Sequence, residues 1–514
     1  MLFRSGSVLG NARVAVEGTG VETVTDDGGR FRLPGLPPGR VVLNISYVGY
    51  DRQQVGVDVT ANDTVRREIE LLLSNRVSGA AGDAPVRLTE FTVVEQREIT
   101  AQALSMNEQR AAPNLISVVA LDEYGDLGQE NVGDFLRFLP GLTVGSSGLT
   151  ASEISVRGLP SDTTQIMVDG NVVTSSEAGR VVPPHIVSLA NVTRAEVTKV
   201  PTPDAPAGGL GGTVNLKRRN AFERKSPLLS YSVYQLLNTD SGITFGGGPR
   251  GQLPGVSPKF HEPSWSLSYV HPINERLGVT AGVGTTWRKR GQDGRNETPT
   301  WNLVNLFQRT SQYSHLRSIV KTRTGQVGAD WRVGPRDTLA ANFEYKDRWV
   351  MVPREVLLIN YGAGAVGDAT FTQGATTGVG SSTMSGGASQ LTRNVSRIGS
   401  LRYSHRGDGW ELSASGAVSA AASRTRDLSN GHFSNISATL SNLIIRGEGI
   451  GEGGATIPTR YRVTDRAGQR LNLLDGANYT INTATSNESD SESESVQARV
   501  DLQRDFRGFI LRVG

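Results

Sequence analysis

The sequence predicts a mainly β fold made of a small N-terminal β-sandwich, an α+β domain, and the first strands of an antiparallel transmembrane β-barrel. Three observations predict it. Residues 7–73 alternate in short segments cut by Gly and Pro, residues 105–222 combine one helical pattern with short strands, and residues 227–514 alternate over longer segments. Alternation with a period of two is typical of a strand that has one buried face.

Composition excludes several other classes of protein. The 514 residues contain no Cys, which removes disulfide scaffolds, thiolate zinc sites and cysteine nucleophiles together. The 53 basic and 50 acidic residues leave a net charge of only +3, so no strong field indicates a nucleic-acid partner. The six His residues lack the spacing of a catalytic metal site. We therefore expect no metal, no cofactor and no enzymatic activity.

A helical membrane span is also excluded, because no run of about 18 apolar residues occurs. Membrane β-strands are not covered by this test, since they alternate and average to a modest hydropathy. Both ends of the chain predict a piece of a longer protein. Met1–Ser5 has one basic residue and no apolar export signal behind it, and Gly508–Gly514 alternates like a strand and stops without a turn.

Residues 1–73 are assigned to the sandwich. Arg13–Val16 alternates, a turn follows, and the Pro- and Gly-rich segment Leu36–Gly39 separates the next strands. Asp26 and Asp27 carry carboxylates that could bind calcium. Turns favour Asp and Gly at such positions, however, so we interpret both residues as part of a turn.

Residues 74–104 form a polar connector that is rich in Ser and Gly. One short stretch inside it alternates, and its residues are Leu88, Thr89, Glu90, Phe91, Thr92, Val93 and Val94. An extended apolar segment in a linker is suited to pairing with the sheet edge of another protein. The alternative is a last strand of the preceding sandwich.

Residues 105–222 are assigned to the α+β domain. The spacing predicts a helix over Asn131–Leu139, which the following Pro-Gly pair stops. Short strands come next, and the domain closes with the Gly-rich segment 208–216. This segment lacks the Lys-Ser/Thr of a phosphate-binding loop, so we assign it a structural role. The domain contains no cluster of acid, base and nucleophile.

Five motifs of this domain occur in the order and spacing of the plug domain of TonB-dependent outer-membrane receptors, which the chain resembles. The motifs are Leu139-Pro140-Gly141, Val156-Arg157-Gly158-Leu159, Met167-Val168-Asp169-Gly170, Lys199-Val200-Pro201-Thr202-Pro203 and Gly208-Gly209-Leu210-Gly211-Gly212-Thr213-Val214-Asn215-Leu216. Residues 25–39 resemble the carboxypeptidase regulatory-like domain, a familiar extension of such receptors, without its first strand. That resemblance implies an accessory module with no peptidase chemistry.

The resemblance also implies a location and partners. It places the barrel in the bacterial outer membrane, in contact with lipid, and the N-terminal domain and linker in the periplasm. Leu88–Val94 occupies the position of the TonB box, although its sequence departs from the best-known boxes. Such a box binds a TonB-type energy-transducing protein, which an inner-membrane motor drives. The ligand is expected to bind extracellular loops and an outward plug loop, whose residues are Gly145, Ser146, Ser147 and Gly148.

Residues 223–514 are assigned to the N-terminal part of the barrel, because alternating segments such as Trp265, Leu267 and Tyr269 recur in pairs. Short turns are expected near 271–275, 334–337, 406–409 and 505–508. Long polar loops are expected at about 289–324, 351–396 and 423–494. We count about nine strands, whereas plugged outer-membrane transporters close with about 22, so this stretch is not expected to close a barrel.

Three charged motifs are given structural interpretations. Arg157 and Asp169 are expected to form ion pairs that hold the plug in the barrel, in preference to contacting ligand. Arg406-Gly407-Asp408 spells an adhesion tripeptide but occupies a predicted hairpin turn. The acidic run Ser486–Ser495 could hold calcium, and we interpret it as a solvated, mobile part of a loop.

The function that follows is energy-coupled uptake of a scarce or bulky nutrient across the outer membrane. Siderophores, cobalamin and oligosaccharides are all served by the architecture that the chain resembles, and its loops carry no readable code for the ligand. The alternatives are an outer-membrane signal transducer, an extracellular β-rich adhesin and a nonfunctional receptor fragment. The regulatory-like extension differs from that of signal transducers, and the alternation of short and long connections is unlike an adhesin.

Overall fold

The structure is a computed structural model. The residues that it describes are 2–3, 9–25, 29, 31–33, 35–48, 50–60, 65–71, 101–112, 114–120, 132–137, 139–147, 150–176, 181–187, 192–201, 205–206, 208–223, 226–235, 263–296, 301–302, 307–362, 366–367, 373–376, 380–387, 390–407, 409–454, 457–506 and 509–514. Among these residues, no helix is both long and apolar enough to cross a membrane.

The N-terminal domain is built on a four-stranded antiparallel sheet in the order β3-β2-β4-β5. Its strands are β2 Arg13–Val16, β3 Glu22–Val24, β4 Gly39–Ser46 and β5 Gln53–Val59, and a short parallel pair joins β1 Leu2–Phe3 to β6 Glu70–Leu71. Side chains that alternate along β4 pack into one apolar core, as the period-two pattern predicts. The predicted turn residues Asp26 and Asp27 lie outside the described residues.

The α+β domain contains a five-stranded mixed sheet in the order β11-β10-β13-β12-β7. Its strands are β7 Ile116–Ala120, β10 Thr164–Val168, β11 Asn171–Val172, β12 Val192–Thr198 and β13 Gly212–Arg218. The other elements are α1 Ala101–Ala111, α2 Val132–Leu136, the hairpin β8 Leu142–Ser147 with β9 Thr150–Val156, and the 3-10 turns η2 Ser161–Thr163, η3 Pro184–Ile186 and η4 Ala221–Glu223. One face of this sheet carries the apolar core of the domain.

The helices differ from the sequence expectation in extent. The helix expected over Asn131–Leu139 is the five-residue α2, because a tighter turn bonds Leu139 N to Leu136 O at 3.0 Å before the Pro-Gly pair. The helix α1 begins inside the segment that was expected to be linker. Its polar sequence has no clear apolar periodicity, so this helix could not be found from the spacing of apolar residues.

Residues from 228 onward form a 16-stranded sheet, within which nine strands follow one another as antiparallel neighbours. They are β14 Leu228–Tyr234, β15 Ser264–Pro272, β16 Leu277–Asn296, β19 Thr310–Arg332, β20 Asp337–Met351, β25 Leu391–Gly407, β26 Trp410–Arg426, β30 Ser489–Phe506 and β31 Phe509–Val513. Among the described residues, β14 and β31 each pair on one side, so the sheet is open. The predicted mainly β fold class is confirmed.

The expectation of long loops without strands is wrong. The ranges 351–396 and 423–494 contain the other seven strands of the large sheet, namely β21 Arg354–Asn360, β22 Val366–Gly367, β23 Gln373–Ala375, β24 Gly380–Gly387, β27 Asn435–Glu448, β28 Arg460–Thr464 and β29 Thr480–Thr485. The range 289–324 contains the end of β16 and the start of β19. A separate short pair joins β17 Trp301–Asn302 to β18 Phe307–Gln308.

The register explains why these polar segments form strands. Strand β19 pairs with β20 at Ile319↔Met351 and continues into β21 at Leu316↔Arg354 without a shift. Only Val352 and Pro353 interrupt the ladder, and proline has no N–H to donate to it. The β19–β20 ladder therefore continues into β21, and backbone pairing sets the structure where side-chain polarity suggested a loop.

The acidic run is also strand. Asp490, Glu492 and Glu494 lie on β30, which pairs with β26 from Ser489 to Arg504. Asp490 forms an ion pair with Arg426 at 2.7 Å. The assignment of Ser486–Ser495 to a loop is therefore wrong from Ser489 onward, whereas Asp490 and Glu492 are exposed to solvent as expected. The opposite charges of the neighbouring strand stabilise an extended conformation that the acidic run alone would not favour.

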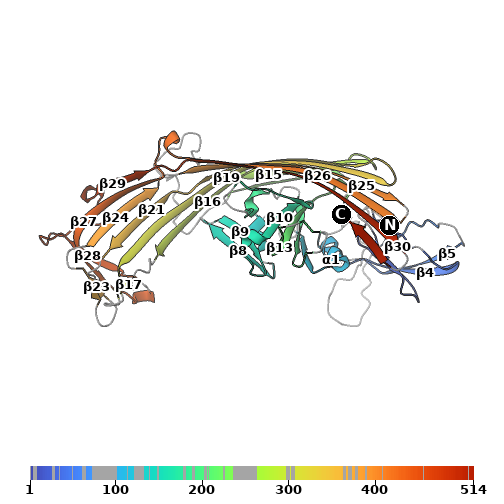
Figure 1. The fold of residues 1–514 in the computed structure, drawn as a ribbon, viewed down its shortest axis with the longest axis horizontal. Helices are drawn as coiled ribbons and strands as arrows, with labels where there is room; N and C mark the ends of the chain where they lie inside the picture. The colour runs from blue at the N-terminus through green and yellow to red at the C-terminus, as the bar shows by residue number, and fades with distance from the viewer. Residues whose placement is uncertain are drawn as a thin grey trace, which may run out of the picture.

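The three parts are arranged around the curvature of the large sheet. Figure 1 shows the sheet as an arch, with the α+β domain against its concave side and the N-terminal domain at the end where the short turns lie. The strands that lie within the expected loop ranges, among them β24, β27 and β29, extend the sheet and form the opposite end of the arch.

Candidate functional site

The candidate site is the contact between the α+β domain and the concave face of the large sheet. A two-residue turn of the domain, Asp169-Gly170, lies at this contact. It joins β10 to β11, where Val168 pairs with Asn171, and its residues have φ of +50° and +82°. Two left-handed residues define the type I′ hairpin turn, which Asp-Gly favours. Arg402 of β25 donates a hydrogen bond to the carbonyl oxygen of Asp169.

A chain of ion pairs joins this turn to the sheet. The Asp169 carboxylate accepts from Arg218 Nη1 at 3.2 Å, and Arg218 Nη2 lies 2.8 Å from Glu344 Oε2 on β20. The side chains of Arg218 and Glu344 are 2% and 1% exposed. Removal of one partner from a buried pair leaves an uncompensated charge, which costs about 3–5 kcal/mol. These ion pairs therefore fix the α+β domain against the large antiparallel sheet, which is called the wall from here on.

The other predicted plug residues lie within the domain. Arg157 donates from Nη2 to the carbonyl of Gly211 at 3.4 Å, so its described contact is to backbone and not to a wall carboxylate. A Cβ at Gly212 would lie 2.7 Å from the carbonyl of Thr198 and 2.9 Å from Val156. Only glycine fits such a close approach, which supplies a packing reason for the Gly-rich motif. Pro140, Gly141 and Gly158 lie in the turns that precede β8 and follow β9.

Side chains of four wall strands also bond to the backbone of the domain. The bonds are Lys346 Nζ to Val187 O at 3.0 Å, Ser396 Oγ to Ile186 O at 3.1 Å, Thr174 N to Ser419 Oγ at 3.1 Å and Val172 N to Gln497 Oε1 at 2.9 Å. The three neutral hydrogen bonds contribute only about 1 kcal/mol each, and the bond from the charged Lys346 contributes about 1.5–3 kcal/mol. The contact is thus specific but separable.

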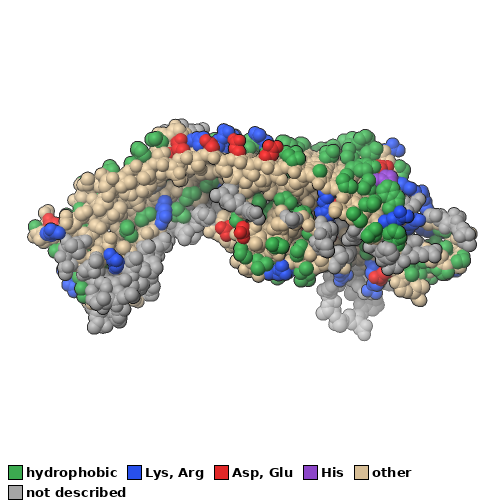
Figure 2. All heavy atoms as spheres, in the orientation of Figure 1, with side chains coloured by type: hydrophobic (Ala, Val, Ile, Leu, Met, Phe, Trp, Pro, Cys, Tyr) green, Lys and Arg blue, Asp and Glu red, His purple; other side chains and the backbone are tan. Residues whose placement is uncertain are grey.

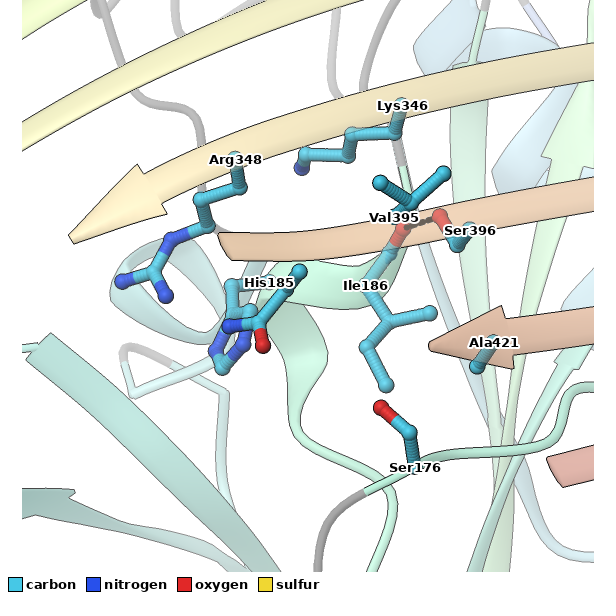
Figure 3. A pocket seen from close by; sticks show the side chains of 9 residues that line it. Ser176, His185, Ile186, Lys346, Arg348, Val395, Ser396 and Ala421 are labelled. Atoms are coloured by element: carbon cyan, nitrogen blue, oxygen red, sulfur yellow. Dashed lines mark hydrogen bonds between the residues drawn. The ribbon is translucent and has the colours of Figure 1, made fainter. Parts of the chain in front are cut away.

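A small cavity lies in this contact, between η3 and strands β20, β25 and β26. Figure 3 shows Lys346 and Arg348 from one wall strand beside His185 of η3, with Ser176 across from them. The cavity volume is about 10 Å³, the room of one water molecule. The domain and the sheet are therefore closely packed at this point of the contact.

Sequence reasoning missed Arg218, Glu344 and the other wall residues of the contact. The sequence contains part of the information, because alternation assigns Glu344 and Lys346 to the polar face of β20. Which of the many inward polar residues meets the plug depends on how two separate domains dock, and no local pattern encodes that.

A second ion-pair cluster holds α1 against the sheet of the domain. Glu108 of α1 pairs with Arg194 of β12 at 3.1 Å and with Lys217 of β13, and Lys217 also lies 2.9 Å from Glu196. Burial alone would lower the pKa of Lys217, but the two carboxylates raise it above its ordinary value. Lys217 therefore remains charged, and the cluster is held together by ionic contacts.

The predicted coupling segment Leu88–Val94 and the predicted ligand residue Gly148 lie outside the described residues. Gly145, Ser146 and Ser147 belong to β8. In Figure 1 the β8–β9 hairpin points toward the end of the arch that carries the extended strands.

The convex face of the sheet is apolar toward the short-turn end. Gln497 contacts the domain, so its even-numbered neighbours on β30 face away from it, and Val496, Val500 and Leu502 are 73%, 59% and 43% exposed. Large apolar residues exposed on the other strands are Leu229, Tyr231, Val233, Trp265, Leu267, Val283, Val327, Trp331, Phe343, Leu401, Trp410 and Val418. Figure 2 shows apolar side chains gathered at the short-turn end, with acidic and basic side chains together beyond them. A patch of this extent requires an apolar partner.

This fold is that of an antiparallel, barrel-like sheet that carries a plug. A model of the carboxypeptidase regulatory-like domain matches residues 3–72, and a model of the TonB-dependent receptor plug domain matches residues 108–213. The chain therefore carries both domains, which confirms the predicted resemblance to TonB-dependent receptors.

Individual relatives match over part of their length. The iron-regulated outer membrane virulence protein of Vibrio cholerae is 30% identical over 142 residues, which are 26% of this chain and 21% of that protein. The chain thus spans about a fifth of this curated relative. A mutant of the ferric enterobactin receptor of Pseudomonas aeruginosa has a TM-score of 0.34 at 15% identity, over 80% of this chain and 62% of that one. The outer membrane transporter YddB of Escherichia coli has a TM-score of 0.31 at 12% identity, over 75% and 53%.

Proposed function

We propose that this chain forms the plug and part of the barrel of a TonB-dependent transporter, which takes up a scarce or bulky nutrient across the bacterial outer membrane. The observation that carries the proposal is a domain seated on the concave face of a sheet whose convex face is apolar. The apolar face suits lipid, and the seated domain controls passage along the other face. The task is movement of a solute, so it requires no covalent chemistry.

The height of the apolar face supports a membrane location. On β30 its outward residues run from Val496 through Leu502 to Phe506, and Arg504, near the short-turn end, lies over the Phe506 ring at 5.3 Å. Ten residues at about 3.3 Å each, tilted by about 40°, span about 25 Å, which is the apolar height of outer-membrane barrels. Beyond Val496 the outward residues are charged, and Asp490 and Glu492 pair with Arg424 and Arg426. We place the short-turn end, with the N-terminal domain, in the periplasm, because short turns of such barrels face that side.

We propose that ligand approaches from the end with the extended strands, where Gly145 and Ser146 of the β8–β9 hairpin are candidate contacts. Siderophores, cobalamin and oligosaccharides are the candidate classes. The relative from Vibrio cholerae is named for its regulation by iron, which makes a ferric siderophore the first class to test.

We propose that Leu88–Val94 is the segment that binds the TonB-type protein, by adding a strand to an open sheet edge of that partner. In strand addition, main-chain hydrogen bonds supply most of the affinity, so many side-chain sequences are compatible with binding. The segment precedes α1, so force on it reaches the plug at its N-terminal helix.

The test is a deletion of Leu88–Val94 in the full-length receptor, with deletion of Gly79–Pro85 from the same connector as the matched control. Energy-dependent uptake and surface binding are measured with radiolabelled ferric siderophores, cobalamin and oligosaccharides. We expect the first deletion to abolish uptake and spare binding, and the control to retain both. Unchanged uptake after the first deletion would remove Leu88–Val94 as the coupling segment.

A further inference from the structure

An apolar groove crosses the convex face of the wall at strands β15, β16, β19 and β20. Its cavity volume is about 370 Å³, which falls in the range of about 300–1,000 Å³ that small-molecule sites occupy. Gly325 of β19 lies at the groove, and a Cβ at this position would meet no atom within 4 Å. The large side chains around the glycine are Leu267, Tyr269, Val283, Val327, Phe343 and Tyr345. The groove therefore exists because a residue without a side chain lies among large apolar and aromatic neighbours.

The contact of β20 with the plug shows which way the groove faces. Lys346 donates to the carbonyl of Val187, so its side chain points to the concave side of the wall. Tyr345 precedes Lys346 on the strand and points to the opposite side. Gly325 lies directly opposite Tyr345 in the β19–β20 register, and directly opposite residues share a face. The groove therefore opens on the convex side of the wall.

Two arginines lie at one end of the groove. Arg323 comes two residues before the groove glycine on β19, and Arg397 of β25 lies directly opposite Tyr345. Both arginines are exposed, and neither forms an ion pair with any residue that the structure describes. The carboxylate of Asp347, opposite Arg323, is held instead by Arg393 at 2.8 and 3.0 Å. Two guanidinium groups, a type that binds phosphate oxygens through parallel N–H bonds, are therefore left without an acidic partner beside the groove.

The two arginines lie at the level where the apolar face ends. Arg323 and Arg397 are each about ten residues from the short-turn ends of β19 and β25, as Val496 is from the end of β30. Trp287 and Trp349 lie on the two strands that flank β19, opposite the residue two positions beyond Arg323. Tryptophan is typical of the boundary between acyl chains and head groups. The groove thus lies at the depth of the acyl chains and the arginines at the depth of the head groups.

We propose that the convex face binds one lipid molecule that has an anionic phosphate head group. The phosphate is held by Arg323 and Arg397, and an acyl chain lies in the groove over Gly325. Charge complementarity selects the head group, because basic clusters at this depth attract lipid phosphates. The site rests on the proposed membrane location of this face, and it is independent of the nutrient that the receptor transports.

Lipid binding to the full-length receptor in detergent tests the head-group contact. Native mass spectrometry measures the affinities for dioleoyl phosphatidic acid and for dioleoyl phosphatidylcholine, which have the same acyl chains. We expect the acid to bind more tightly, and Arg323→Gln or Arg397→Gln to weaken its binding about fivefold, because each cation near an anionic head group contributes about 1 kcal/mol. Arg424→Gln is the matched control, since Arg424 already pairs with Glu492 at 3.4 Å. Equal affinities for the two lipids, or losses no greater than in the control, would overturn the proposal.

The groove is tested separately from the arginines. Gly325→Leu fills the groove, whereas Gly416→Leu adds the same side chain on β26, away from it. We expect the first substitution to weaken phosphatidic acid binding about tenfold by overpacking, and the second to leave it unchanged. Glycerol 3-phosphate, which has the head group without acyl chains, is expected not to displace the lipid at equal concentration. Unchanged binding by Gly325→Leu, or displacement by glycerol 3-phosphate, would mean that the arginines bind a soluble anion and that the lipid site is wrong.

Uptake by the same receptors separates this site from the proposed function. A receptor that transports a nutrient without preferring the anionic lipid would disprove the lipid site alone. A receptor that prefers phosphatidic acid but transports none of the candidate nutrients would disprove the transport proposal alone.

Discussion

The interior of the plug and its contact with the wall differ in polarity. The plug core contains 17 buried apolar residues among those described, and Ile398 is the single one that the wall contributes. The contact with the wall is instead made of ion pairs and of hydrogen bonds from wall side chains to plug backbone. A domain whose apolar core is formed almost entirely by its own residues can separate from the wall without unfolding. This difference is what a movable plug requires.

The largest expected effect is in the plug core. Leu216 of β13 is fully buried there. Leu216→Ala is expected to destabilise the plug by about 4 kcal/mol, because it removes buried apolar area and leaves a cavity. Urea dependence of hydrogen exchange in β10 and β13 measures the loss. A loss below about 1 kcal/mol would mean that the wall, and not the core, holds the plug together.

A smaller loss of free energy is expected at the contact between the plug and the wall. Glu344→Ala leaves Arg218 with Asp169 alone, and we expect the contact to weaken by about 3 kcal/mol. The measurement is exchange in residues 164–172, with Ser396→Ala as a control that costs about 1 kcal/mol. The triple variant Asp169→Asn, Arg218→Met and Glu344→Leu removes all three charges, keeps a residue that favours this turn, and is expected to recover most of the loss. Equal costs for Glu344→Ala and Ser396→Ala would contradict the ion-pair account.

The convex face of the wall differs from the concave face, because it exposes apolar side chains. Val500 lies near the middle of the apolar stretch of β30. Val500→Lys is expected to cost about 2 kcal/mol of folding free energy in lipid vesicles, because it places a charge at the depth of the acyl chains. Glu494→Lys, on the same face beyond the apolar stretch, is the control. If the two substitutions cost the same, this face does not contact lipid.

The sequence predicts the fold further than it predicts the site. Period-two alternation predicted strands near β15, β16, β19 and β20. The plug motifs identified the domain that lies against the sheet formed by these strands. Polar composition misled at Ser489–Glu494, where pairing with β26 outweighs the preference of an acidic run for solvent. Arg218 and Glu344 form their pair only after two domains dock, which a pattern within either segment does not contain.

The most direct test of a movable plug is a disulfide between plug and wall. Thr174 Oγ1 and Ser493 Oγ lie 2.7 Å apart across the contact, so Thr174→Cys with Ser493→Cys suits a bridge in this Cys-free chain. The full-length receptor carrying both substitutions is assayed for uptake of whichever radiolabelled candidate nutrient the parent receptor transports, and Thr174→Cys alone is the control. We predict that oxidation blocks uptake while ligand binding persists, and that reduction restores uptake. Full uptake through a receptor whose plug is bonded to its wall would contradict the account.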